Sequence, residues 1–327
     1  MSKFLGYAEA MTNKFTFLLL TILSTSGFAL ETDQFIAVDI DLKDSSEVMN
    51  SYFNKNIEKS LIEANAKKLS CEQTALKVME NLTGKFSISK ASSYASASAL
   101  VERFPYDNIS ERSYKDQSFY EHAWLPLQVV DLARTINING IHLGTDKFGH
   151  FTHMGMSYYK NYLKFKKVGL SESGAIKKAI IKGFNSEYGI LGYGIGGVLS
   201  YADLEANYQG FMFALDMCRT ENALLIVKEG EWIENPKHRF DLRSYFTPKL
   251  DESFNLSFWR KPLYERIQKK LLQEYCNVQK SPMYQERMIT YRRILKENLN
   301  DLLIQDNILT QEKYDRRLED IEKACLK

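Results

Sequence analysis

The residues best suited to chemistry are two carboxylates on either side of a glycine-rich stretch. Glu187 lies where one helix is predicted to end, and Asp203 lies in the first turn of the next. Five of the ten residues after Glu187 are glycine, whose lack of a Cβ lets backbone approach a ligand closely. A helix C-terminus is the negative end of the helix dipole, which predicts a raised pKa for Glu187. Such a carboxyl group suits a general acid near neutral pH.

Asp203 has two interpretations. In Ser200-Tyr-Ala-Asp203 it occupies the third helical position after a serine cap, where its carboxylate would only accept a backbone N–H. Alternatively it is catalytic, and activates water or stabilises positive charge in a transition state. Asn207 follows one turn later on the same helix face. If Asp203 is only a cap, Glu187 would act as a single acid.

Three tyrosines surround these carboxylates: Tyr188, Tyr193 and Tyr201. Their rings offer flat apolar faces suited to stacking on a sugar ring, with a hydroxyl at one end. The alternative is that they pack beneath the glycine-rich loop. The acid chemistry of Glu187 needs no cofactor.

A second polar group begins at Asp146. Asp146, His150 and His153 recur at helical spacing, which places them on one helix face. Two imidazoles and a carboxylate can bind zinc or iron, so these residues, with Glu187, are the alternative metal site of a metal-dependent hydrolase. The spacing differs from the H-E-x-x-H motif. Otherwise they form a polar seam, in which Asp146 and His150 hydrogen-bond each other, Lys147 pairs with an acid, and the seam positions the glutamate.

The segment from Glu187 to Leu199 resembles lysozyme-like glycoside hydrolases of the bacteriophage and goose type. Those enzymes place a catalytic glutamate at a helix end and follow it with a glycine-rich β-hairpin and another helix. The resemblance implies a glycosidase that cleaves peptidoglycan glycan strands, with Glu187 as general acid and Asp203 as second carboxylate. The substrate-binding residues would be Tyr188, Tyr193, Tyr201 and Asn207.

A longer stretch resembles small envelope-associated families that include VanZ-like proteins. It carries Asp146-Lys147-x-x-His150, then Glu187, then Asp203-x-x-x-Asn207-x-x-Gly210. This resemblance implies little about activity. It supports a non-catalytic envelope-associated binding or structural protein with a buried Asp/His/Glu/Asn network. VanZ-like proteins are membrane-embedded, whereas the corresponding helices here are rich in lysine and tyrosine.

The N-terminal segment predicts export. Residues 15–23 form an apolar run too short to span a bilayer, and Gly27-Phe28-Ala29 is typical of a signal peptidase site. Met11 is a second candidate start. We expect cleavage near Ala29 and a periplasmic or secreted protein without membrane-spanning segments. The net charge of +2 argues against a nucleic-acid-binding protein.

Four cysteines favour disulfides in an oxidising compartment. The preferred pairing is Cys276 with Cys325, within the C-terminal helices, and Cys71 with Cys218, between core elements. Reduced buried thiols are the alternative.

The chain is predicted to be mainly α, and α+β only through a small glycine-rich hairpin or loop. Helices are expected over residues 45–81, 125–137, 145–166, 171–187 and 200–218, while residues 224–227 suit a strand or a buried helix. The expected organisation is a signal peptide (1–29), a main helical domain carrying the site (30–260) and a C-terminal helical extension (261–327). The extension would break near Ser281-Pro282 and Asp306-Asn307, and would cap the core or dock a partner protein.

Overall fold

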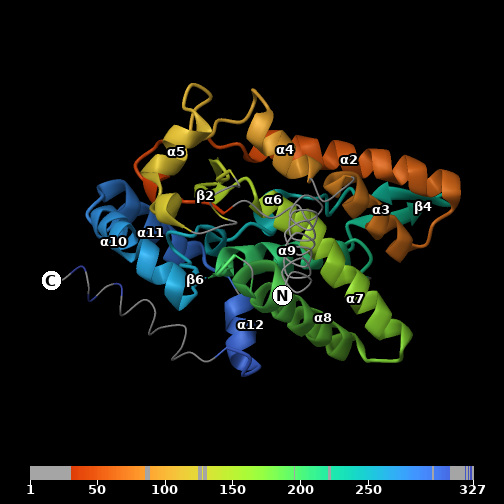
Figure 1. Cartoon of the computed structure of the whole chain (residues 1–327). Coiled ribbons are helices and arrows are strands. Elements are labelled where there is room, and N and C mark those ends of the chain that lie inside the picture. The colour runs from red at the N-terminus through yellow and green to blue at the C-terminus, as the bar shows by residue number, and fades with distance from the viewer. Residues whose placement is uncertain are drawn as a thin grey trace, which may run out of the picture.

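The computed structural model describes residues 31–84, 89–123, 127, 131–194, 196–219, 222–296, 298–309, 321, 323 and 325. This part of the chain is mainly α-helical with a few short antiparallel strands, as predicted (Figure 1). The proposed signal peptide lies outside the described residues. None of the described helices is long and apolar enough to cross a membrane.

The elements before the site are short helices around one long helix, α2. In chain order they are η1 (Phe35–Ala37), α2 (Ser46–Lys67), α3 (Cys71–Thr83), α4 (Lys90–Ala97), α5 (Glu111–Gln117) and η2 (Phe119–His122). A hairpin of β1 (Thr135–Ile138) and β2 (Ile141–Gly144) follows.

The site region is a run of helices with two π-helical segments. It comprises α6 (Lys147–Gly149), η3 (His150–Met154), α7 (Gly155–Lys167), α8 (Glu172–Ser186), η4 (Glu187–Gly194) and α9 (Tyr201–Asp216). Helix α9 lies in the middle of the molecule and is buried along most of its length (Figure 1). Its neighbours include α7, η3, α8 and α12.

The remaining elements close the fold. They are β4 (Leu225–Lys228), β5 (Glu231–Glu234), η5 (Leu242–Ser244), η6 (Pro248–Leu250), β6 (Phe258–Trp259), α10 (Lys261–Val278), α11 (Pro282–Ile294) and α12 (Leu299–Gln305). Strands β4 and β5 pair with each other, and β6 pairs with β3 (Val198–Leu199). The C-terminal breaks fall near the predicted positions, and Leu263, Ile267 and Leu271 of α10 are buried in the same core as α2 and α9.

Serine residues occupy the N-cap position of several helices, because a serine side-chain oxygen can accept a hydrogen bond from a backbone N–H of the first turn. Ser171 caps α8 and Ser200 caps α9 in this way, and the cap at Ser200 is the one that the sequence predicts. Thr145 does not cap α6. Its buried hydroxyl has no hydrogen-bond partner among the described residues.

The helix predicted over 125–137 is wrong where it can be compared. Thr135, Ile136 and Asn137 lie in β1, whereas residues 125, 126 and 128–130 are outside the described part. The hairpin turn is Asn139-Gly140, both with positive φ (54° and 81°). Asn-Gly suits this tight turn, and it outweighs the helical periodicity of the preceding apolar residues.

The glycine-rich stretch is not a hairpin either. Residues 187–194 continue from α8 as the π-helix η4, and the strand that follows, β3, pairs with β6 rather than with a neighbouring strand. The small β part of the described fold therefore comes from three two-stranded pairs, and none of them is a hairpin within the glycine-rich stretch.

Both preferred disulfides are present. Cys71 pairs with Cys218, joining the start of α3 to the end of α9, and Cys276 pairs with Cys325. Two disulfides fit a protein that folds outside the cytoplasm.

Candidate functional site

The two π-helical segments carry two of the polar residues that the sequence analysis names as candidate site residues. His150 begins η3, and Glu187 begins η4. A π-helical turn inserts extra backbone into a helix, and such turns are frequent at functional sites. Helix α9 supplies Asp203 and Asn207 from the opposite side.

Lys147 lies at the centre of the buried charge. Its ammonium Nζ donates to Asp146 Oδ2 at 2.6 Å, Asp203 Oδ1 at 2.7 Å and Glu252 Oε1 at 2.6 Å, and the side chain is fully buried. Burial alone would lower the pKa of Lys147, but the carboxylates of Asp146, Asp203 and Glu252 hold it well above its usual value. The lysine is therefore a fixed cation inside the protein.

The carboxylates around this ammonium differ in the hydrogen bonds that they accept from other residues and in their pKa values. Asp146 Oδ1 accepts from the hydroxyl of Thr32 at 2.7 Å, and Glu252 Oε1 accepts from Ser200 at 3.2 Å. Burial raises the pKa of Glu252 to about 7. Burial also acts to raise the pKa of Asp203, but His150 and Lys147 outweigh it and hold that pKa below its usual value. This lowered pKa keeps the Asp203 carboxylate ionised.

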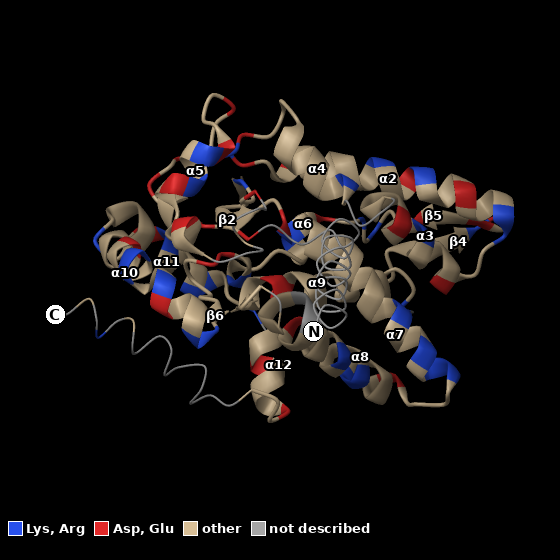
Figure 2. Cartoon of the chain, in the orientation of Figure 1, with Lys and Arg blue, Asp and Glu red and all other residues tan. Residues whose placement is uncertain are grey.

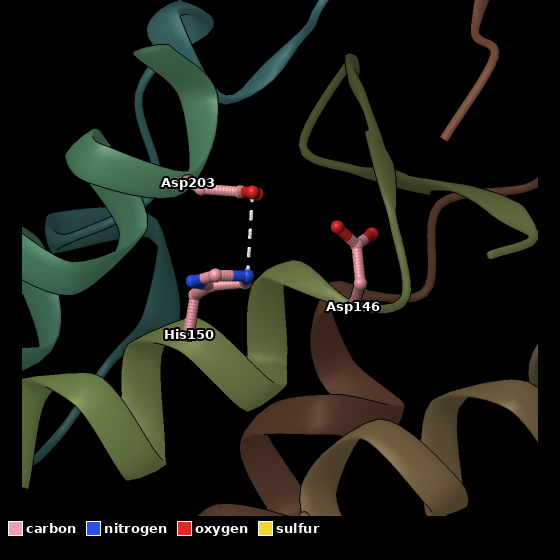
Figure 3. A group of neighbouring side chains, drawn as sticks. All are labelled: Asp146, His150 and Asp203. Carbon is pink, nitrogen blue, oxygen red and sulfur yellow. Dashed lines mark ion pairs between the residues drawn. The ribbon is translucent and has the colours of Figure 1, made fainter. Parts of the chain in front are cut away.

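An amide connects this charge cluster to Glu187. Asn207 Nδ2 donates to Glu187 Oε1 at 3.2 Å, so Asn207 Oδ1 faces His150 Nδ1 at 2.9 Å. An amide oxygen only accepts, and His150 Nδ1 therefore carries a proton. His150 Nε2 lies 3.3 Å from Asp203 Oδ2 (Figure 3) but has no aligned hydrogen bond among the described residues. Glu187, Asn207, His150 and Asp203 form one chain of contacts.

Glu187 is buried, with 7% of its surface exposed. Burial raises its pKa, the Asp203 charge adds to the rise, and His150 and the Asn207 hydrogen bond oppose it. The sequence predicts the direction of this shift but gives the wrong cause. The helix does not end at Glu187, so desolvation of the carboxyl group is responsible rather than exposure to a helix end.

The tyrosines separate into two groups. Tyr188, which is 51% exposed, stacks between Phe184 and Tyr193, with ring centroids 6.0 and 5.2 Å away. Tyr193 stacks in turn on Phe258 of β6 at 5.7 Å. We call Phe184, Tyr188, Tyr193 and Phe258 the aromatic row. Tyr201 is buried in the core at the start of α9 and is not part of this row.

Metal-ligating atoms gather at a different set of residues from the predicted one. Ligand atoms of Asp146, His150 and Asp203 lie within 4.8 Å of one another. His153 does not join them in the described structure, because the π-helical turn of η3 shifts the helical register between His150 and His153. The Lys147 ammonium already binds one oxygen of each aspartate, so it occupies the position of a cation between them.

The sequence does not reveal the residues that complete the charge cluster. Glu252 and Thr32 come from irregular segments with no periodicity, far from α6 in the chain. Glu31 also approaches the cluster: burial, with the charges of Asp203 and Glu252, raises its pKa well above the usual value. Glu252 lies in an aromatic-rich stretch that also carries Asp251, Ser253 and Asn255, and nothing in its spacing marks it.

No family model matches the chain, and comparisons with curated proteins and with solved structures found no match. The likeness to lysozyme-like enzymes and to VanZ-like proteins stays a prediction, and the functional conclusion depends on the site itself.

Proposed function

We propose that the protein is a periplasmic or secreted glycosidase that cleaves peptidoglycan glycan strands, with Glu187 as general acid. The observation that carries this proposal is a buried glutamate with a raised pKa, held by Asn207 and followed directly by the partly exposed aromatic row. A general acid must keep its proton at neutral pH until the glycosidic oxygen takes it. Aromatic rings beside it would bind sugar rings.

Asp203 acts as a positioning residue in this mechanism. Lys147 Nζ donates to Asp203 Oδ1, and Asp203 Oδ2 lies 3.3 Å from His150 Nε2, which leaves little room for this carboxylate to activate water. The remaining route uses one acid. Glu187 protonates the glycosidic oxygen as its bond to the anomeric carbon breaks, a hydroxyl of the same sugar attacks that carbon, and the glutamate recovers the hydroxyl proton.

The test compares wild type with Glu187→Gln on purified peptidoglycan in acetylated and deacetylated forms, with fragments identified by mass spectrometry. Glu172→Gln, at the exposed start of α8, is the matched control. We expect anhydro-ended fragments from wild type and the control, and none from Glu187→Gln, with all three proteins folded by melting curves. Fragments from Glu187→Gln at the wild-type rate would exclude Glu187 as the acid.

One observation favours a second candidate, a non-catalytic envelope protein with a buried polar core. The polar atoms of the network mostly pair with one another, and Glu187 and Asp203 are each only 7% exposed. The exposed apolar residues of and after α11, Met283, Ile289, Ile294 and Leu295, would then dock a partner protein. Absence of fragments from every form, with Glu187→Gln clearly less stable, would support this candidate.

A further inference from the structure

The helical hairpin formed by α7 and α8 carries a concentrated positive charge. Residues 155–186 contain a single acid, Glu172, and seven exposed lysines: Lys160, Lys164, Lys166, Lys167, Lys177, Lys178 and Lys182. The whole chain has a net charge of only +2. Figure 2 shows these lysines on the outer parts of α7 and α8, which run side by side to a shared turn at one corner of the molecule.

Most of this charge is not neutralised by acids. Of these seven lysines, only Lys166 and Lys177 form ion pairs within the described part of the chain, with Glu172 at 3.1 Å and with Asp306 at 2.6 Å. The ammonium of Lys178 lies 5.9 Å from the ring centroid of Phe165, so it covers an apolar side chain rather than an acid. The hairpin therefore presents a positive surface with apolar groups between the charges.

The turn of the hairpin is apolar. Val168 is 72% exposed at the end of α7, and Gly169 follows it in a positive-φ conformation (88°). Lys164, Lys167 and Lys178 lie within roughly 10 Å of this turn along their helices, since each helical residue advances 1.5 Å. That distance is about one Debye length at physiological ionic strength. An apolar tip surrounded by lysines is the arrangement that peripheral proteins present to anionic lipid headgroups.

We propose that the tip of the α7–α8 hairpin docks on an anionic phospholipid surface. Lysines around the turn contact the headgroups, and Val168 enters the boundary between headgroups and acyl chains. This surface lies on the outer side of α7 and α8, and the proposal is independent of whether Glu187 is catalytic.

The test is co-sedimentation of the exported, processed protein with vesicles of phosphatidylcholine alone and with vesicles that also contain phosphatidylglycerol. We expect binding only to the anionic vesicles, and loss of that binding at high salt. The triple variant Lys164/Lys167/Lys178→Gln should bind at least about tenfold more weakly, because each lysine near an anionic surface adds to the electrostatic attraction. The matched control Lys55/Lys59/Lys67→Gln removes three exposed lysines from α2 and should bind as wild type.

The variant Val168→Asn distinguishes binding to a membrane from binding to a soluble polyanion. We expect it to weaken vesicle binding while leaving any binding to inorganic polyphosphate unchanged. Equal vesicle binding by Val168→Asn and wild type, with full competition by polyphosphate, would overturn the membrane proposal in favour of a polyanion. Equal binding by the two triple variants would overturn the role of the hairpin.

Discussion

The buried ammonium of Lys147 determines the charge balance of the site. Three carboxylates contact it, and burial makes an unpaired charge at any of them costly. The lysine thereby fixes the position of Asp203 and, through His150 and Asn207, that of Glu187.

Replacing this lysine should destabilise the protein strongly. We expect Lys147→Met to lower the free energy of unfolding by about 3–5 kcal/mol, because it leaves three buried carboxylates without their cation. Chemical denaturation measures this loss. Lys166→Met, which removes the exposed pair with Glu172, should change it by less than about 1 kcal/mol. A similar small loss for both variants would show that Lys147 is not the counter-ion of the cluster.

A second buried pair predicts a pH dependence of stability. Burial, together with the charge of Asp33 and a hydrogen bond to it, raises the pKa of Glu274 to about 10, and Lys270 opposes this only in part. The folded protein keeps a proton that the unfolded chain releases above about pH 4.5, so stability falls as pH rises between these values.

Glu274→Gln tests this dependence, because the amide stays neutral at every pH. We expect the unfolding free energy of wild type, relative to Glu274→Gln, to decrease steadily from about pH 4.5 toward pH 10. Denaturation at a series of pH values measures the difference. The exposed Glu265→Gln, on the same helix, is the matched control. A flat difference for Glu274→Gln would contradict a shared proton with Asp33.

At the scale of the elements, α9 crosses η3 and α7 at a backbone contact. Gly155 and Gly210 face each other there, and a Cβ on Gly210 would lie 1.8 Å from the carbonyl oxygen of Phe151. This crossing brings Asn207, one turn before Gly210, within reach of His150.

Gly210→Ala should therefore push the helices apart. We expect a loss of about 1–3 kcal/mol in the free energy of unfolding, as for other overpacked cores, together with loss of any glycan cleavage. Gly189→Ala is the control, since a Cβ there meets no atom within 4 Å. Chemical denaturation and the peptidoglycan assay are the measurements. Unchanged stability in Gly210→Ala would mean that the two helices do not touch at this point.

The sequence shows that several polar residues lie near one another in the fold, but it does not predict the backbone that carries them. Serine caps and helical spacing place Asp203 and Asn207 on one helix and Glu187 at the end of another, and the structure brings Asn207 into contact with Glu187. The sequence does not predict the π-helical turns at His150 and Glu187, because such turns shift the register of the backbone hydrogen bonds without any change in residue propensity. For the same reason the metal set expected from the spacing of His150 and His153 does not form. Glu252 was missed because its position depends on tertiary packing.

At the scale of the whole molecule, the C-terminal helices belong to the hydrophobic core. The hydroxyl of Tyr291 donates to Asp251 and accepts from the backbone N–H of His142, each at 2.9 Å. The N–H of Leu299 donates to the buried carboxylate of Glu205 at 2.8 Å. These contacts join α11 and α12 to the loops and helix that carry the site.

A chain that ends at residue 260 should not fold. We expect it to lose cooperative unfolding, because Leu263, Ile267 and Leu271 would leave an apolar surface uncovered. Circular dichroism with thermal melting measures this. A chain that ends at Leu309 and carries Cys276→Ser, which loses one disulfide but keeps α10 to α12, is the control and should stay cooperative. Cooperative melting of the shorter chain would show that residues 261–327 are a separate extension.

The disulfide between Cys71 and Cys218 encloses every residue from Asp146 to Gly210, and with them most of the site. A chain with free thiols has a larger unfolded ensemble to order before those residues meet. The protein therefore reaches full stability only in an environment that oxidises thiols.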